Sequence, residues 1–128
     1  ERITSYGHRV VVLGVLPQWG KSLPQVYFDQ SMNEGFLVDF RKEFPSLPNR
    51  IFPSDIDNLH QVDARIARLA KKAGVKFYSP LDILCNQLGC LGIVDGENGL
   101  MFSAWDYGHL TYEGSSFLGR RLAELMAE

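Results

Sequence analysis

The segment from Trp105 to Gly114, WDYGHLTYEG, places an aspartate three residues before a histidine. A histidine that acts as a general base on a hydroxyl needs one free ring nitrogen, while an acceptor, usually a carboxylate, holds the other nitrogen and fixes the tautomer. Asp106 and His109 can form such a pair within one turn, because Gly108 between them allows backbone conformations that a side chain forbids. The same residues also fit a simpler arrangement, in which Asp106 caps the following helix beside an ordinary surface histidine.

Two aromatic residues, Trp105 and Tyr107, lie within the same segment. The faces of aromatic rings suit the apolar faces of pyranose rings, so both side chains are candidates for binding a sugar substrate. Packing in the core is the alternative for Trp105. Trp19, which follows the first predicted strand, is open to the same two interpretations.

The composition limits the class of protein. The chain has 128 residues, 45% hydrophobic and 22% charged, which is enough for one ordinary core, so we expect a single domain over residues 1–128. A formal net charge of −2 offers no basic surface for nucleic acid. No apolar run approaches the roughly 18 residues that a membrane span needs, so we expect no direct membrane contact by this chain.

Cys85 and Cys90 are the only cysteines and lie in CNQLGC. Two ligands do not complete a tetrahedral zinc site, and we expect neither a metal nor a cofactor. The pair is either two independent buried thiols or a local disulfide, which by the loop-entropy argument would contribute roughly 2 kcal/mol at most. A disulfide would indicate an oxidising compartment.

Strand and helix patterns alternate along the chain. Residues 9–17, RVVVLGVLP, form a continuous β-branched run of the kind that is buried on both faces of a parallel sheet. Residues 18–53 are interrupted by Pro, Gly and polar residues and predict a long connection with one short helix at most. Apolar residues at helical spacing predict a helix over 59–73, with Asp55, Asp57 or Asn58 as its cap and Gly74 as its stop.

The second half of the chain continues this alternation. Residues 75–80, VKFYSP, predict a strand, and a short helical turn follows at LDILC; residues 100–106, LMFSAWD, predict the strand that leads into the histidine turn. Leu118, Leu122 and Leu125 predict a final helix with Glu113 in its first turn. The order predicts an α/β fold in which helices cover a parallel sheet, with functional loops at the carboxyl ends of strands.

Three segments, VVVLGVLPQWGKSLP, PLDILCNQLGC and LMFSAWDYGHLTYEG, occur in an order that resembles the distal half of an SGNH (GDSL-like) hydrolase domain. The resemblance is strongest to the domains fused to bacterial membrane O-acyltransferases, which acetylate cell-surface polysaccharides. The last sequence block of that family is Asp-x-x-His, then Leu, then Ser or Thr, and shortly Gly. Here Asp106, His109, Leu110, Thr111 and Gly114 match it.

This resemblance implies a partial three-layer sandwich of the flavodoxin-like SGNH type, in which a parallel sheet is flanked by helices. It also implies that His109 is the base of a catalytic triad and that Asp106 orients it. Cys85 and Cys90 resemble the paired cysteines of the same subgroup, which adds to the case for a disulfide.

The nucleophile of the family has no counterpart here. The family's serine lies in a Gly-Asp-Ser sequence just after its first strand, and its oxyanion-hole Gly and Asn also precede the region that the resemblance covers. None of the serines of this chain follows a Gly-Asp pair, and Ser103, the one nearest the histidine turn on its amino-terminal side, lies in a predicted strand. We therefore expect the chain to be the distal part of a longer domain and to be inactive by itself.

The resemblance implies a parent protein that moves an acyl group, with acetyl as the favoured case, between a carrier and a sugar hydroxyl or water. Its substrates would be carbohydrates or acylated small molecules. It would carry a transmembrane acyltransferase domain and act in the bacterial periplasm or at the extracytoplasmic face of the inner membrane. The alternative is a non-catalytic α/β binding or interaction module in which Asp106 only caps the last helix.

Overall fold

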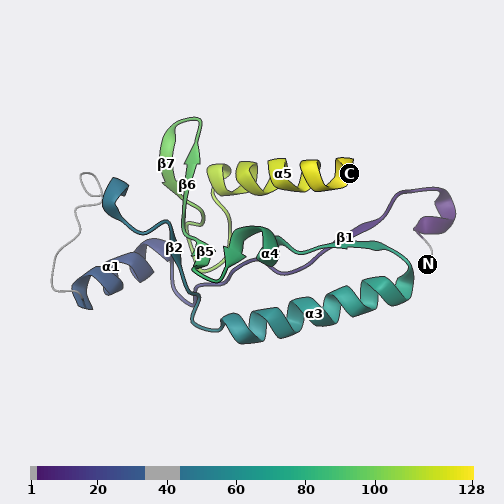
Figure 1. Ribbon diagram of the computed structural model, residues 1–128, viewed down its shortest axis with the longest axis horizontal. Coiled ribbons are helices and arrows are strands. Elements are labelled where there is room, and N and C mark those ends of the chain that lie inside the picture. The colour runs from purple at the N-terminus through teal and green to yellow at the C-terminus, as the bar shows by residue number, and fades with distance from the viewer. Residues whose placement is uncertain (1–2, 34–43) are drawn as a thin grey trace.

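The computed structural model describes residues 3–33 and 44–128 and shows a mixed α/β fold (Figure 1). The described elements, in chain order, are η1 (Thr4–Tyr6), β1 (Val11–Leu13), α1 (Leu23–Asn33), η2 (Phe44–Ser46), β2 (Arg50–Ile51), α3 (Ile56–Ala73), β3 (Lys76–Tyr78), α4 (Pro80–Leu84), β4 (Cys85–Asn86), β5 (Gly89–Leu91), β6 (Ile93–Gly96), β7 (Gly99–Phe102) and α5 (Tyr112–Ala127). A parallel strand pair with helices beside it confirms the α/β class that the sequence predicts.

Strands β1 and β3 form the parallel pair, and α3 is the crossover between them. Val12 lies opposite Phe77 in the register, and α3 runs alongside both strands (Figure 1). The predicted helix is confirmed, although it begins earlier, at Ile56. Asp55 occupies the cap position without a side-chain hydrogen bond, and Gly74 ends the helix at a φ of 69°, which favours glycine.

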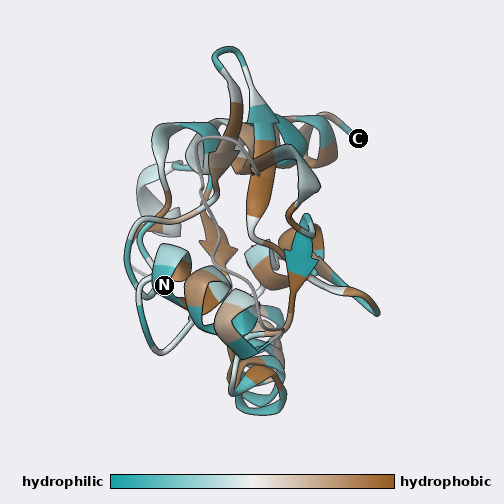
Figure 2. Cartoon of the chain, turned by 90° about the vertical axis from the view of Figure 1, so that its left-hand side faces the viewer, coloured by the Kyte–Doolittle hydropathy of each residue, from teal (hydrophilic) through white to brown (hydrophobic). Residues whose placement is uncertain are grey.

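The strand before the histidine turn is not parallel to its neighbour. Strand β7 pairs antiparallel with β6, with Val94 opposite Met101, and β2, β5 and β4 form a second antiparallel sheet. The physical reason is the short connection, because the register closes at Gly96 and Gly99 and a two-residue loop can join only antiparallel strands. The hairpin changes from hydrophobic residues at its base to hydrophilic ones at its tip (Figure 2).

The main core lies where α1 meets the antiparallel strands. Its buried residues are Trp19, Leu23, Tyr27, Ile51, Cys90, Ile93, Phe102 and Ala104. The Tyr27 hydroxyl donates a hydrogen bond to the carbonyl oxygen of Pro48 (2.7 Å), and burial raises the pKa of this phenol. Helix α1 therefore anchors the long connection predicted over residues 18–53, of which residues 34–43 lie outside the described part.

The β-branched run in residues 9–17 is less buried than its pattern predicts. None of the residues from 10 to 16 is buried, and Leu13 is 46% exposed. The expectation of a strand covered on both faces is wrong for this structure, because α3 packs along one side of the pair and no other described strand pairs with β1. Within the described residues, no helix is long and apolar enough to cross a membrane.

Candidate functional site

Asp106 and His109 lie side by side on the turn that joins β7 to α5. The Asp106 Oδ2 and His109 Nδ1 atoms are 2.6 Å apart, while Oδ1 accepts hydrogen bonds from the backbone N–H groups of Gly108 (2.9 Å) and His109 (2.7 Å). One carboxylate oxygen therefore shapes the turn and the other orients the imidazole.

The hydrogen bonds to Asp106 favour its ionised form. They lower the pKa of its carboxyl group to about 2, and the largest cause is the backbone N–H of Gly108, followed by the backbone N–H of His109 and then the His109 side chain. The His109 side chain is 78% exposed. Its Nε2 atom has no hydrogen-bond partner in the part of the chain that the structure describes, so it is free to accept a proton from a hydroxyl.

The turn is held against the segment that follows β1. The backbone N–H of Trp19 donates to the carbonyl oxygen of Tyr107 (2.7 Å), and that of Leu23 donates to the carbonyl oxygen of Asp106 (3.2 Å). Gly108 packs against Gln18, since a Cβ atom at Gly108 would lie 3.6 Å from the Gln18 side chain. Because Trp19 and Leu23 are core residues, the core itself sets the position of the turn.

Thr111, not Asp106, caps the last helix. The Thr111 Oγ1 atom accepts from the backbone N–H of Gly114 (3.0 Å) and donates to the carbonyl oxygen of Phe102 (2.7 Å). A Cβ atom at Gly114 would lie 2.2 Å from the Ser103 carbonyl oxygen, so the helix needs glycine there to approach so closely. The interpretation in which Asp106 caps this helix is therefore wrong.

Ser103 is a structural residue in this fold. Its side chain is buried, and its hydroxyl donates to the carbonyl oxygen of Leu91 (2.7 Å). Its backbone accepts a hydrogen bond from the N–H of Thr111 (3.0 Å). The hydroxyl has no access to His109 in this arrangement.

Trp105 and Tyr107 both reach the surface beside the histidine. They are 58% and 52% exposed, and the ring of Tyr107 meets that of His109 edge-on with centroids 5.8 Å apart. The core-packing interpretation of Trp105 is wrong, and Trp19 is the tryptophan that fills the core. Contact of Trp105 or Tyr107 with a substrate stays a prediction.

The same Asp-x-x-His spacing occurs a second time, at Asp57 and His60 on α3. Both residues are described and exposed, yet no hydrogen bond or ion pair joins their side chains. Sequence analysis missed this repeat of the pattern. The Asp-x-x-His spacing alone therefore does not bring the two side chains into contact. The conformation of the turn at 106–109 does so for Asp106 and His109.

Cys85 and Cys90 are joined by a disulfide and lie opposite each other in the antiparallel register of β4 and β5. In the described residues no group of three or more His, Cys, Asp or Glu side chains could hold a metal ion.

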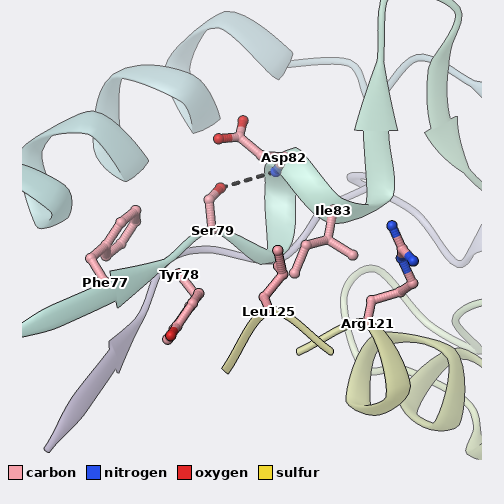
Figure 3. Close-up of a pocket in the computed structure, with 7 residues that line it drawn as sticks. All are labelled: Phe77, Tyr78, Ser79, Asp82, Ile83, Arg121 and Leu125. Carbon is pink, nitrogen blue, oxygen red and sulfur yellow. Dashed lines mark hydrogen bonds between the residues drawn. The ribbon is translucent and has the colours of Figure 1, made fainter. Parts of the chain in front are cut away.

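A groove of about 420 Å³ lies away from the Asp–His pair, between β3, α4 and the end of α5, and its lining does not include Asp106 or His109 (Figure 3). The Asp–His pair stands on an open surface instead.

A mixed α/β fold with a parallel strand pair and an Asp-x-x-His turn ahead of its last helix is of the SGNH type. The chain belongs to the family described as the SGNH domain (fused to AT3 domains), whose family model matches residues 1–124. Comparison with curated protein sequences finds no match.

Among solved structures, the chain is similar to the lipopolysaccharide acetyltransferase periplasmic domain of Salmonella ser. Paratyphi A. The TM-score is 0.74 at 24% sequence identity, and the alignment covers 99% of this chain and 45% of that one. The likeness supports the fold, and the chain spans less than half the length of this structural relative.

Proposed function

We propose that this chain supplies the general base and its orienting acid to an SGNH-type acyl-transfer site, and that the serine nucleophile comes from polypeptide outside these 128 residues. The observation that carries the proposal is the contact between Asp106 Oδ2 and His109 Nδ1, which leaves Nε2 free. We use "the longer protein" below for this chain together with the polypeptide that supplies the serine.

In the proposed reaction, His109 Nε2 takes the proton of the serine hydroxyl as its oxygen attacks the acyl carbonyl. Asp106 accepts the hydrogen bond from Nδ1–H and stabilises the imidazolium that forms. Its low pKa, about 2, keeps the carboxylate ionised throughout. When the tetrahedral intermediate collapses, His109 returns the proton to the leaving oxygen, and the acyl group stays on the serine.

The second half of the reaction uses the same base. His109 removes the proton from an incoming sugar hydroxyl or water, whose oxygen attacks the acyl-serine, and the serine then leaves as its hydroxyl takes the proton back. The open position of the imidazole, with its side chain 78% exposed, suits an acceptor as large as a polysaccharide.

The proposed substrate is an O-acyl group, with O-acetyl as the favoured case, of a cell-surface polysaccharide. Three observations support it: family members are fused to AT3 domains, the similar solved structure is a lipopolysaccharide acetyltransferase periplasmic domain, and two aromatic residues of the histidine turn, Trp105 and Tyr107, are exposed. The disulfide supports an extracytoplasmic location, in the periplasm or at the outer face of the inner membrane. The AT3 part of the longer protein would be its membrane domain.

The test is a histidine substitution in the longer protein. His109→Gln should lower kcat/KM for acetyl-ester turnover by about 10²- to 10⁴-fold, the usual contribution of a general base. His60→Gln is the matched control, because it removes an exposed histidine with the same Asp-x-x-His spacing and should leave the rate unchanged. If His109→Gln kept full activity while carbohydrate binding depended on Trp105 and Tyr107, the non-catalytic binding module would be the correct alternative.

A further inference from the structure

A separate pocket opens near the start of α1. It has a volume of about 330 Å³ and is lined by Trp19, Gly20, Lys21, Val26, Asp29 and Ser54; we call it the Trp19 pocket. Small-molecule sites in proteins typically have volumes of roughly 300–1,000 Å³, so this pocket is at the lower end of that range. Its size suits one compact ligand.

The Trp19 pocket is built on the segment that holds the histidine turn. The backbone N–H of Trp19 donates to the carbonyl oxygen of Tyr107 (2.7 Å), and that of Leu23 donates to the carbonyl oxygen of Asp106 (3.2 Å). Gly20 and Lys21 lie between these two contacts in the chain and line the pocket. The pocket is therefore fixed in position relative to the turn that carries His109.

Two of the lining residues form an ion pair in which each charge compensates the other. Lys21 Nζ donates to Asp29 Oδ2 (2.8 Å), and Gln25 Nε2 donates to Asp29 Oδ1 (2.7 Å). These hydrogen bonds, that from Lys21 first, lower the pKa of the Asp29 carboxyl group. A carboxylate has about four lone-pair sites and an ammonium group has three N–H donors, so both groups keep capacity for a ligand.

Two further polar groups of the pocket lack a partner among the described residues. They are the Ser54 hydroxyl and the Trp19 indole N–H. Trp19 is only 4% exposed, yet the described part of the chain leaves no fully buried side-chain nitrogen or oxygen unpartnered. The indole N–H therefore keeps contact with solvent, and a ligand in the pocket that Trp19 lines can supply its partner.

This lining matches the chemistry of an uncharged sugar residue. Trp19 and Val26 give the pocket an apolar part, and the polar groups offer both donors and acceptors to sugar hydroxyls. An anionic ligand would meet the Asp29 carboxylate, and the Lys21 charge is already compensated by it. A purely apolar ligand would take water from these groups without replacing the hydrogen bonds.

We propose that the Trp19 pocket binds an uncharged sugar residue of the acceptor polysaccharide, other than the residue whose hydroxyl reacts at His109. That the ligand belongs to the acceptor rests on the proposed function. Contacts with a part of the acceptor that does not react lower its KM and hold the reacting hydroxyl near the base. Asp29 and Lys21 are the residues that select this sugar.

The Asp29→Ala variant of the longer protein tests the pocket. The acceptor is surface polysaccharide of the source bacterium, freed of O-acetyl groups with mild base, and the acyl donor is an aryl acetate. The KM for the polysaccharide should rise at least about tenfold, because hydrogen bonds to a charged group are lost. Hydrolysis of the aryl acetate without polysaccharide should keep its rate. An unchanged KM for the polysaccharide would refute the sugar contact.

Glu124→Ala is the matched control. It also removes an exposed carboxylate from an ion pair, with Arg121, but Glu124 lies on α5 and does not line the Trp19 pocket. The KM for the polysaccharide and the rate of aryl acetate hydrolysis should both stay unchanged. If Asp29→Ala, and not Glu124→Ala, slowed aryl acetate hydrolysis, Asp29 would support the fold or the reaction centre instead, and the proposal would be wrong.

Small glycosides test the class of ligand. At least one of the uncharged methyl glycosides of glucose, galactose and mannose should compete with the polysaccharide, and its inhibition constant should rise at least about tenfold in Asp29→Ala. The methyl glycoside of glucuronic acid should compete at least about tenfold more weakly, because its carboxylate would meet Asp29. Equal competition by the glucuronide, or no competition by any of the three neutral glycosides, would contradict the assignment.

This inference and the proposed function can fail separately. Calorimetry measures polysaccharide binding to the His109→Gln form of the longer protein, with and without Asp29→Ala. Binding that depends on Asp29, together with full activity of His109→Gln, would remove the proposed function and leave the sugar pocket in place. An inactive His109→Gln protein whose affinity for the polysaccharide is unchanged by Asp29→Ala would leave the catalytic role in place and remove the pocket.

Discussion

At the scale of residues, the Asp106 carboxylate performs two tasks with its two oxygens. Oδ1 accepts the backbone N–H groups that shape the turn, and Oδ2 contacts the imidazole. The backbone contacts are the larger causes of its lowered pKa. Asp106 would therefore stay ionised and in place even when the imidazole is removed.

This gives a prediction for the titration of Asp106. Its carboxyl carbon, followed by NMR, should titrate with a pKa of about 2, against about 3.9 for an unperturbed aspartate. Because the folded pKa is the lower one, the ionised carboxylate stabilises the turn above about pH 4, and this stabilisation is lost as the pH falls through about 2.

The His109→Ala variant separates the causes. It removes the side-chain hydrogen bond and keeps both backbone donors, so the pKa of Asp106 should rise only part of the way toward its ordinary value. A full return to about 3.9 in this variant would show that the backbone donors do not hold the carboxylate.

At the scale of elements, the start of α5 fixes the turn from its carboxyl side. The Thr111 side chain links the helix to β7 through Gly114 and Phe102. The close approach of Gly114 to Ser103 keeps the helix tight against the strand end. The threonine and the glycine that match the SGNH block are thus explained by packing, whereas the aspartate and the histidine face outward.

Two alanine substitutions in α5 should have opposite effects. Gly114→Ala places a Cβ atom 2.2 Å from the Ser103 carbonyl oxygen, so backbone must shift, and we expect a loss of about 1–3 kcal/mol in the free energy of unfolding. Gly119→Ala meets nothing within 4 Å and should stabilise the helix by roughly 0.5–1 kcal/mol. Urea denaturation measures both, and a Gly114→Ala protein as stable as the wild type would contradict the packing described here.

At the scale of the whole molecule, the described residues hold the proposed base, His109, with no serine hydrogen-bonded to it. The buried Ser103 hydroxyl donates its hydrogen bond to the carbonyl oxygen of Leu91. The parallel pair has an open edge on β1. Both observations agree with the proposal that the serine comes from polypeptide outside these 128 residues.

The 128-residue chain alone should not hydrolyse aryl acetates above the rate of its His109→Ala variant. The reason is that no hydroxyl of the described residues is hydrogen-bonded to His109, and a surface imidazole gives only slow, non-specific turnover. Stopped-flow assays of the two proteins make the comparison. A burst of product from the wild-type chain, absent from the variant, would reveal a nucleophile that the structure does not show.

Local sequence alone determined several features correctly. The helix over 56–73 follows from apolar spacing within one segment and from Gly74, whose small size permits the left-handed stop. The α/β class follows from the alternation of such segments. The SGNH resemblance follows from the block around Asp106 and His109, because its spacing and neighbours are contiguous in the chain.

Tertiary structure decided the features that depend on distant partners. Asp57 and His60 have the same spacing as Asp106 and His109, yet only the second pair meets, because the Trp19 and Leu23 backbones hold the turn at 106–109. Likewise, a tryptophan is equally apolar at 19 and 105, and only the packing of α1 against the hairpin buries the first and exposes the second. The open edge of β1 was decided in the same way, since strand pairing depends on the partners that a strand meets after folding.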